Sequence, residues 1–362
     1  MKWKNATTTG LSVTTGQPRV LLAAARKLYR RAMIVDGNVA PCLDDVIPQP
    51  SATLTLHQDS GLTAIKITIG GAEGTFESTL EDIAFYLRVM EAHSDVFMQI
   101  RCVNDFAVAK RKRRLGLIFS FEGIEMLEGK IERIQLFRDF GVRVMQLSYN
   151  TTSPFGAGVL TSPLSGLTAL GAQAVEEMHT SGIAIDLSHS NRQTTFDVID
   201  RSKRPVLMTH AGCAAVHMHP RNKTDDELRA VAETGGVVGI YMLPYLTASP
   251  RQPTLDDYLA HMSHALKVCG EDHVGIGSDT TINGFDPSIE NMARFNQGVA
   301  YRKAKGIGAP EEDRPIFVEG LNTSRRCEVI ADALLARRYP IRITEKVLGA
   351  NFIRTFTDVW GS

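Results

Sequence analysis

The sequence predicts a single (β/α)8 barrel of the TIM type. Eight short apolar runs rich in β-branched residues each end in polar or glycine residues, and stretches with helical periodicity separate most of them. Strands that alternate with helices imply a parallel sheet with right-handed crossovers. Eight such units close most naturally into a barrel. The alternative is an open doubly wound sheet, but no GxGxxG motif follows the first strand.

The elements follow one another in chain order. Residues 1–19, rich in Thr, Gly and Ser, predict a loose leader, and residues 20–362 predict one barrel domain with a C-terminal helical extension. A helix over Val20–Met33 leads into the first strand. The predicted strands are Met33–Val39, Ala64–Ile69, Leu115–Phe121, Val142–Tyr149, Ile183–Ser188, Pro205–Thr209, Gly236–Met242 and Val274–Ser278. The predicted helices include Leu80–His93, Leu167–Thr180, Asp225–Thr234 and Leu255–Cys269, and a closing helix opens at Leu348.

The composition is that of a globular enzyme. Forty basic residues balance forty acidic ones, which argues against a dedicated nucleic-acid binder. Five scattered cysteines without a CxxC pair predict reduced thiols. No stretch reaches the roughly 18 apolar residues that a membrane span requires. We therefore expect a cytoplasmic protein, with the periplasm or export as the alternative if a targeting peptide was removed.

Polar side chains collect where the predicted strands end. Glu122 follows the third strand, His189 the fifth, His210 the sixth and Asp279 the eighth. Because these strand ends share the C-terminal mouth of a barrel, the four side chains are expected to lie together. Imidazoles and carboxylates suit zinc or another divalent first-row metal. Such an ion lowers the pKa of a bound water toward about 7, so hydroxide becomes available at neutral pH.

Other residues near these strand ends allow a different interpretation. A single histidine at a strand end is more often a hydrogen-bonded structural residue, and only the combination of four residues favours a metal site. His217 and His219 are expected to be surface or substrate-side groups. Cys213 is interpreted as a packed small residue rather than a ligand.

Several longer segments resemble the membrane (renal) dipeptidase family of zinc peptidases. The paired DLSH and THAGC segments, followed by RNKTDDEL, carry the most specific part of the likeness. The segments FSFEGIEML, VMQLSYNTTSPFG, HVGIGSDTTINGF and LGANFIRTF extend it, so that it covers the chain from about Arg31 to Phe356. The resemblance implies an amidohydrolase-like (β/α)8 barrel, in agreement with the strand count.

The resemblance also assigns roles to particular residues. It implies two zinc ions bridged by Glu122, with His189 and His210 completing the second metal site and Asp279 beside the first metal. It implies that Arg221 and the neighbouring Asn222 bind the substrate, with the arginine on its carboxylate. Tyr149 would face the tetrahedral intermediate. A homodimer is a further implication.

The first strand departs from the family pattern. The family has Asp-Gly-His-x-Asp at this point, and its His and last Asp bind the first zinc; here the run is Asp36-Gly37-Asn38-Val39-Ala40. Because Asn38 is a poor zinc ligand and Ala40 has no side-chain donor, we expect one metal ion rather than two. Asp279 would then act as general base toward the metal-activated water. Asp36, Asp44 and Asp45 are less favoured substitutes for the missing ligands.

Three functions remain open at this level. The first is a metal-dependent hydrolase of a dipeptide or small carboxylated amide, in which metal-activated water attacks the carbonyl group. The second is a family member that has drifted to another ester, amide or lyase reaction. The third is a binding protein that keeps the pocket without turnover. The segments Pro48–Gly74 and Gly284–Pro315 are candidates for a pocket cover or a dimer contact.

Overall fold

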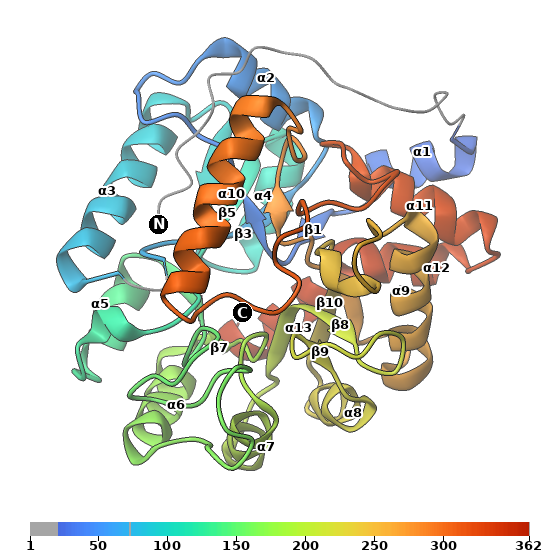
Figure 1. Ribbon diagram of the computed structural model, residues 1–362. Helices are drawn as coiled ribbons and strands as arrows, with labels where there is room; N and C mark the ends of the chain where they lie inside the picture. The colour runs from blue at the N-terminus through green and yellow to red at the C-terminus, as the bar shows by residue number, and fades with distance from the viewer. Residues whose placement is uncertain (1–20, 72–73, 362) are drawn as a thin grey trace.

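A computed structural model describes residues 21–71 and 74–361 and shows a closed parallel barrel (Figure 1). Adjacent strands pair in parallel around the ring, in the order β7-β6-β5-β3-β1-β11-β10-β8. A parallel bridge between Asp186 and Leu207 joins β7 to β8, with the Leu187 amide donating to the Leu207 carbonyl at 2.7 Å. The barrel strands are β1 (Val35–Asp36), β3 (Ala64–Thr68), β5 (Leu115–Phe121), β6 (Val142–Met145), β7 (Ala184–Ile185), β8 (Leu207–Cys213), β10 (Val237–Ile240) and β11 (Val274–Ile276).

The predicted barrel is therefore confirmed. Seven of the eight predicted runs contain a barrel strand, and the run Pro205–Thr209 covers the first part of the longer β8. The predicted leader, residues 1–19, lies outside the described residues.

Helices follow the strands and surround the barrel. The predicted helices correspond to α3 (Phe76–Ala92), α6 (Ala169–Ser181), α8 (Asp225–Glu233) and α9 (Leu255–Cys269), and α1 (Ala23–Arg31) leads into β1. α3 begins four residues before its predicted start because Thr75 and Ser78 form a reciprocal capping box. The remaining helices are α2 (Ser51–Asp59), α4 (Asn104–Lys112), α5 (Arg133–Asp139), α7 (Arg192–Arg201), α10 (Ile289–Ala304), α11 (Arg326–Ala336), α12 (Ile341–Glu345) and α13 (Asn351–Trp360).

Short elements that the sequence did not predict lie at the ends of the barrel strands. β4 (Phe97–Gln99) pairs with the start of β5, and β9 (Asn222–Lys223) pairs with the end of β8. At the mouth, β2 (Val39–Ala40) pairs with β12 (Thr280–Thr281). Next to this pair, the Asp279 amide donates to the Asn38 carbonyl at 2.7 Å. The first and eighth strands are therefore tied together at the edge of the mouth.

The helix α13 closes the opposite end of the barrel. Its Phe352, Phe356 and Val359 pack against apolar residues near the starts of the strands, among them Val35, Ala64, Leu207 and Val237. Phe352 reaches so far inside that a Cβ atom at position 275 would lie 2.5 Å from its ring, so only glycine fits there. With this end filled by aromatic rings, the polar end of the strands is left as the place for chemistry.

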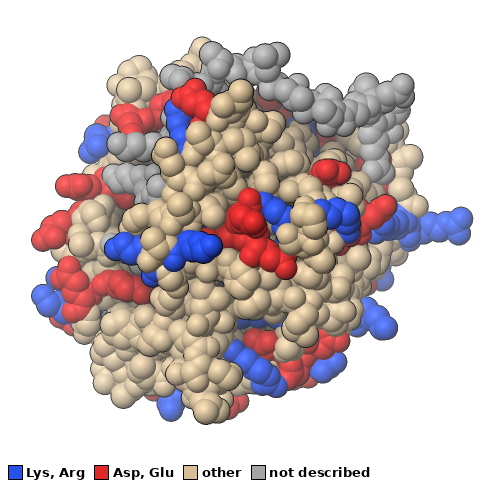
Figure 2. Space-filling model, in the orientation of Figure 1, with Lys and Arg blue, Asp and Glu red and all other residues tan. Residues whose placement is uncertain are grey.

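The helix α10 crosses in front of the barrel in the view of Figure 1. In the same orientation, acidic and basic side chains are intermingled, and no continuous area of one sign appears on this face (Figure 2). No described helix is long and apolar enough to cross a membrane.

Candidate metal centre

Three of the predicted metal ligands meet at the mouth of the barrel. Glu122 follows β5, His189 follows β7, and His210 lies within β8. One ligand atom from each lies within 4.8 Å of the others. The two histidine Nε2 atoms are 3.0 Å apart, and His210 Nε2 is 3.9 Å from Glu122 Oε1. Across residues 21–71 and 74–361 this is the one group of three such side chains.

Neighbouring side chains decide which nitrogen of each imidazole carries the proton. Asn150 donates its amide to the Ile307 carbonyl, so its oxygen faces His189 Nδ1 at 2.7 Å and can only accept. Thr209 donates its hydroxyl proton to Asp186 and therefore accepts from His210 Nδ1 at 2.9 Å. Both Nε2 atoms consequently present lone pairs to the same space. Two lone pairs 3.0 Å apart repel each other unless a cation lies between them, so the donor set fits a metal ion.

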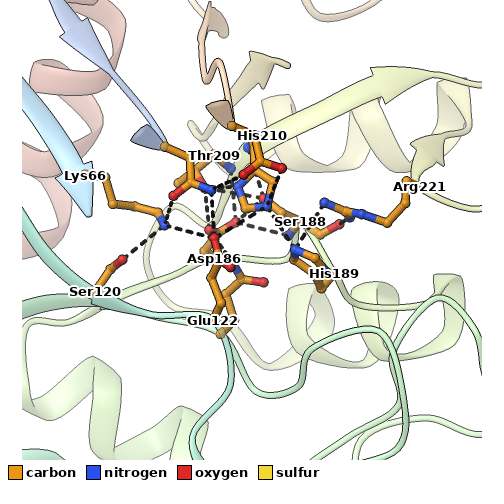
Figure 3. Close-up of polar contacts among 12 residues, drawn as sticks. Lys66, Ser120, Glu122, Asp186, Ser188, His189, Thr209, His210 and Arg221 are labelled. Atoms are coloured by element: carbon orange, nitrogen blue, oxygen red, sulfur yellow. Dashed lines mark hydrogen bonds and ion pairs between the residues drawn. The ribbon is translucent and has the colours of Figure 1, made fainter. Parts of the chain in front are cut away.

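Asp186 lies in the middle of the polar side chains around the two histidines (Figure 3). Its buried carboxylate accepts from the backbone and hydroxyl groups of both Ser188 and Thr209, and also from Gln146 at 3.0 Å. These bonds hold the strand end before His189 against the one before His210. Asp186 therefore positions the ligands and does not belong to the set itself.

Burial also favours neutral imidazoles. The pKa values of His189 and His210 are held well below the ordinary histidine value, first by burial and then by the nearby Arg221 guanidinium. A neutral imidazole is the form that binds a metal.

Arg221 lines the same space from the segment after β8. Its side chain is only 1% exposed, its Nη1 donates to the Ser188 carbonyl, and its Nη2 donates to His189 Nε2 at 3.1 Å. No described carboxylate forms an ion pair with it. Since a buried charge is costly without a partner, this guanidinium fits a carboxylate supplied by a ligand.

Tyr149 lies beside the candidate metal ligands, and Asn222 does not. The Tyr149 ring stacks on His189 with centroids 4.2 Å apart, and burial raises the pKa of its phenol above the ordinary value, so the hydroxyl stays a donor. The Asn222 amide donates to the His217 and Tyr245 carbonyls and accepts from the Tyr241 hydroxyl. With these bonds made, Asn222 holds the loop before Arg221 and does not line the cavity.

His219 differs from the sequence expectation. It is 4% exposed, stacks on Tyr245, and accepts from the Arg221 backbone amide through Nδ1. Its Nε2 donates to the Pro310 carbonyl at 2.8 Å. His219 is therefore a buried support for the arginine rather than a surface group, because the loop after β8 is hydrogen-bonded to the segment that contains Pro310.

Asp279 lies next to the three ligands and is bonded to the first strand. Its Oδ2 is 4.0 Å from His210 Nε2, while its Oδ1 accepts from the Asn38 amide at 2.7 Å. Burial and the neighbouring Glu122 raise the pKa of this carboxyl group to about 7. Ala40 offers no side-chain donor, and Asp36 is turned away to accept from the Ser278 amide at 2.7 Å. The first strand thus supplies one amide where the family pattern has a histidine and an aspartate.

Sequence reasoning missed Lys66, which lies on β3 and points toward the same group of polar side chains as Glu122 (Figure 3). The ammonium group is 1% exposed and donates to Ser120 Oγ at 3.0 Å and to Asn38 Oδ1 at 2.9 Å. A signal was present, because the run Ala64-Ile65-Lys66-Ile67-Thr68 places a lysine among residues that are buried on both faces of a barrel strand. A lysine in such a run must meet acceptors inside the barrel.

The site opens into a cavity of about 1700 Å³. Glu122, His189, Arg221 and Asp279 lie among its lining residues. The two segments predicted as cover or contact regions also contribute, through Gly70, Gly71 and Gly74 on one side and residues between Gly284 and Glu312 on the other. Both segments therefore border the cavity.

A sequence profile described as membrane dipeptidase (peptidase family M19) matches residues 53–301 of this chain. This match covers more than half of the sequence. The chain belongs to the membrane dipeptidase family. The predicted resemblance is thereby confirmed.

Relatives in this family include an uncharacterized dipeptidase of Schizosaccharomyces pombe, 31% identical over 56% of this chain and 50% of that protein. The dipeptidase tcpJ of Claviceps purpurea is 25% identical over 79% of this chain and 60% of its own length. The chain thus spans only about half the length of the first relative and 60% of the second.

Solved structures show the same architecture. An amidohydrolase from Pseudomonas aeruginosa is 29% identical and superimposes with a TM-score of 0.81 over 93% of this chain and 99% of its own. A metallo peptidase from Rhodobacter sphaeroides is 20% identical, with a TM-score of 0.74 over 91% of this chain and 99% of its own. The second likeness concerns the barrel fold of the family only.

Proposed function

We propose that this chain is a metal-dependent hydrolase of a dipeptide or another small amide that carries a carboxylate. The observation that carries the proposal is the convergence of the His189 and His210 lone pairs beside Glu122. Membership of the membrane dipeptidase family supports the same reaction class.

The residues Glu122, His189 and His210 would hold one divalent metal ion, most simply zinc. Two imidazoles and one carboxylate match a catalytic zinc site, which keeps a further position open. When bound, such an ion supplies a Lewis acid and lowers the pKa of a coordinated water. The missing ligands at Asn38 and Ala40 support one ion per chain rather than two.

Arg221 would bind the substrate carboxylate. Its buried guanidinium has no carboxylate partner among the described residues, and two parallel N–H donors suit a carboxylate group. Anchoring the carboxylate there brings the neighbouring amide carbonyl toward the three ligands. Position therefore accounts for part of the expected rate acceleration.

Tyr149 and Asp279 would act on the reacting atoms. The neutral Tyr149 phenol donates a hydrogen bond to the carbonyl oxygen as negative charge develops on it. Asp279 Oδ2 faces the ligands while Oδ1 is held by Asn38, so Oδ2 accepts the proton of the attacking water and passes it to the leaving nitrogen.

The direct test is hydrolysis of a dipeptide panel with added zinc or manganese. Because the cavity is larger than a dipeptide requires, the panel includes N-acyl amino acids and esters with a free carboxylate. The wild-type chain is compared with His189→Ala and Asp279→Asn. We expect turnover in the wild type and a loss of at least about 100-fold in both variants. Equal rates in the three proteins would contradict the catalytic proposal.

A further inference from the structure

The floor of the cavity between the first and eighth strands is occupied by a side-chain amide. Asn38 Nδ2 lies 2.7 Å from Glu122 Oε1 and 2.7 Å from Asp279 Oδ1. An amide NH2 group has two hydrogens, and each of them is directed to one carboxylate. These are the two carboxylates that the family resemblance associates with a first metal ion.

A buried ammonium group completes this arrangement from behind. Lys66 Nζ donates to Asn38 Oδ1 at 2.9 Å and lies 3.9 Å from Glu122 Oε1. It also donates to Ser120 Oγ, whose own proton goes to the Ile67 carbonyl at 2.8 Å. The ammonium fixes the orientation of the amide, because a reversed amide would place NH2 against Lys66 and its oxygen against two carboxylates. The chain of donors from Lys66 through Asn38 therefore ends on Glu122 and Asp279.

We propose that Asn38 and Lys66 together take the place of a first metal ion, as a permanent part of the protein that binds and orients Glu122 and Asp279. This inference rests on the proposed function, in which the second site alone holds an ion. Three features exclude a metal at the first site. The amide hydrogens cover the oxygen atoms that would bind it, the ammonium repels a second cation, and Ala40 provides no ligand.

The arrangement also assigns the two oxygens of Asp279 to different tasks. Oδ1 is held by Asn38, and Oδ2 is left facing His210 Nε2 at 4.0 Å. Asn38 and Lys66 are thus positioning residues for the carboxylate that transfers the proton. In a site with two ions, that carboxylate would instead be bound to metal.

Metal content of designed variants tests the replacement. The double variant Asn38→His/Ala40→Asp restores the two ligands of the family pattern. It is combined with Lys66→Met, which removes the charge, and separately with Lys66→Arg, which keeps it. Each protein is saturated with zinc, freed of loosely bound metal and analysed by elemental mass spectrometry. We expect one equivalent of zinc in the wild type, in the double variant and in the triple variant with arginine, and two in the triple variant with methionine.

A double variant that takes up two equivalents while Lys66 is intact would overturn the role of the ammonium. Two equivalents in the triple variant with arginine would overturn it equally, because arginine keeps the positive charge. If Lys66 only filled space, the arginine and methionine variants would not differ in zinc content on account of charge. A wild-type chain that takes up no zinc contradicts the proposed function instead, so the two failures are distinguishable.

Zinc-edge anomalous diffraction from wild-type crystals soaked in zinc gives an answer that needs no variant. We expect one peak among Glu122, His189 and His210. A second peak between Asn38, Glu122 and Asp279 would overturn the inference even if the triple variants fail to fold.

Discussion

The hydroxyl group of Thr209 sets the protonation of His210. It donates to Asp186 and accepts from His210 Nδ1, which leaves Nε2 free for a metal. We expect Thr209→Val to weaken zinc binding about 10- to 100-fold, the usual effect of removing such a partner. Competition with a chelating dye measures it. Thr355→Val serves as the control, because Thr355 is a buried threonine of α13 at the other end of the barrel. Equal zinc affinities for the wild type and Thr209→Val would contradict this role.

The guanidinium of Arg221 is expected to select substrates with a free carboxylate. Losing a charge-assisted hydrogen bond of this kind costs about 1.5 to 3 kcal/mol. Arg221→Met should therefore raise KM about 10- to 100-fold for a dipeptide. The matched substrate is the same dipeptide with an amidated C-terminus, for which wild type and variant should differ little. Steady-state kinetics measures KM for both substrates. An equal increase in KM for the free and the amidated dipeptide would contradict a contact between Arg221 and the substrate carboxylate.

At the scale of single residues, the sequence alone could predict that Glu122, His189 and His210 lie together, but not which side chains surround them. Glu122, His189 and His210 each follow an apolar run, so their meeting at the mouth was predictable from the barrel. The contact between Asn38 and Lys66 was not, because it joins side chains of different strands through hydrogen bonds that no spacing encodes. The sequence also could not separate Asn222 from its neighbour Arg221. Arg221 lines the cavity, whereas the Asn222 amide donates to two backbone carbonyls and is not available to a substrate.

The packing of α9 against β8 depends on a neutral histidine. His261 Nδ1 accepts from the Cys213 amide at 2.9 Å, and its Nε2 donates to the Leu246 carbonyl at 3.0 Å. Burial lowers the pKa of His261 to about 4. The unfolded chain, with a histidine pKa of about 6.5, binds this proton more readily between the two values. We therefore expect the free energy of unfolding to fall by up to about 3 kcal/mol from this group as the pH falls from 6.5 to 4.

Urea unfolding at several pH values tests the contribution of His261. His261→Gln keeps one acceptor and one donor without a titrating group, so its stability should depend less on pH over this range. His273→Gln is the matched control, because His273 is a half-buried histidine outside the contact between α9 and β8. Parallel pH profiles for the wild type and His261→Gln would show that other groups cause the acid sensitivity.

At the scale of elements, regular strands and helices were predictable and short ladders were not. β5 and α9 agree with their predicted bounds at both ends, because β5 is one continuous buried run and α9 has a clear helical period that begins at a capping box. The two-residue strands β2 and β12 have no such period. They exist because the first and eighth strands of a closed barrel are neighbours, which is a property of the tertiary fold. The pairing of β2 with β12, which brings Asn38 next to Asp279, therefore could not be predicted from the sequence.

For the whole molecule, metal binding is expected to raise thermal stability. An ion that binds only the folded chain stabilises it by about 2.7 kcal/mol at a free concentration 100 times its dissociation constant. Removing the ion with a chelator should therefore lower Tm, and adding zinc should restore it. Differential scanning calorimetry measures the change. His210→Ala should show a much smaller response to zinc, and an equal response would place the stabilising ion elsewhere.

The bridge between Asp186 and Leu207 gives the barrel a seam. His189 follows the strand on one side of this seam, and His210 lies in the strand on the other side. A metal ion bound by both histidines would link the two strands across this seam. The coupling is reciprocal: metal binding disfavours opening of the seam, and opening of the seam weakens metal binding by the same free energy. A substitution that loosens the seam should therefore also weaken metal binding, and removal of the ion should make the seam open more often.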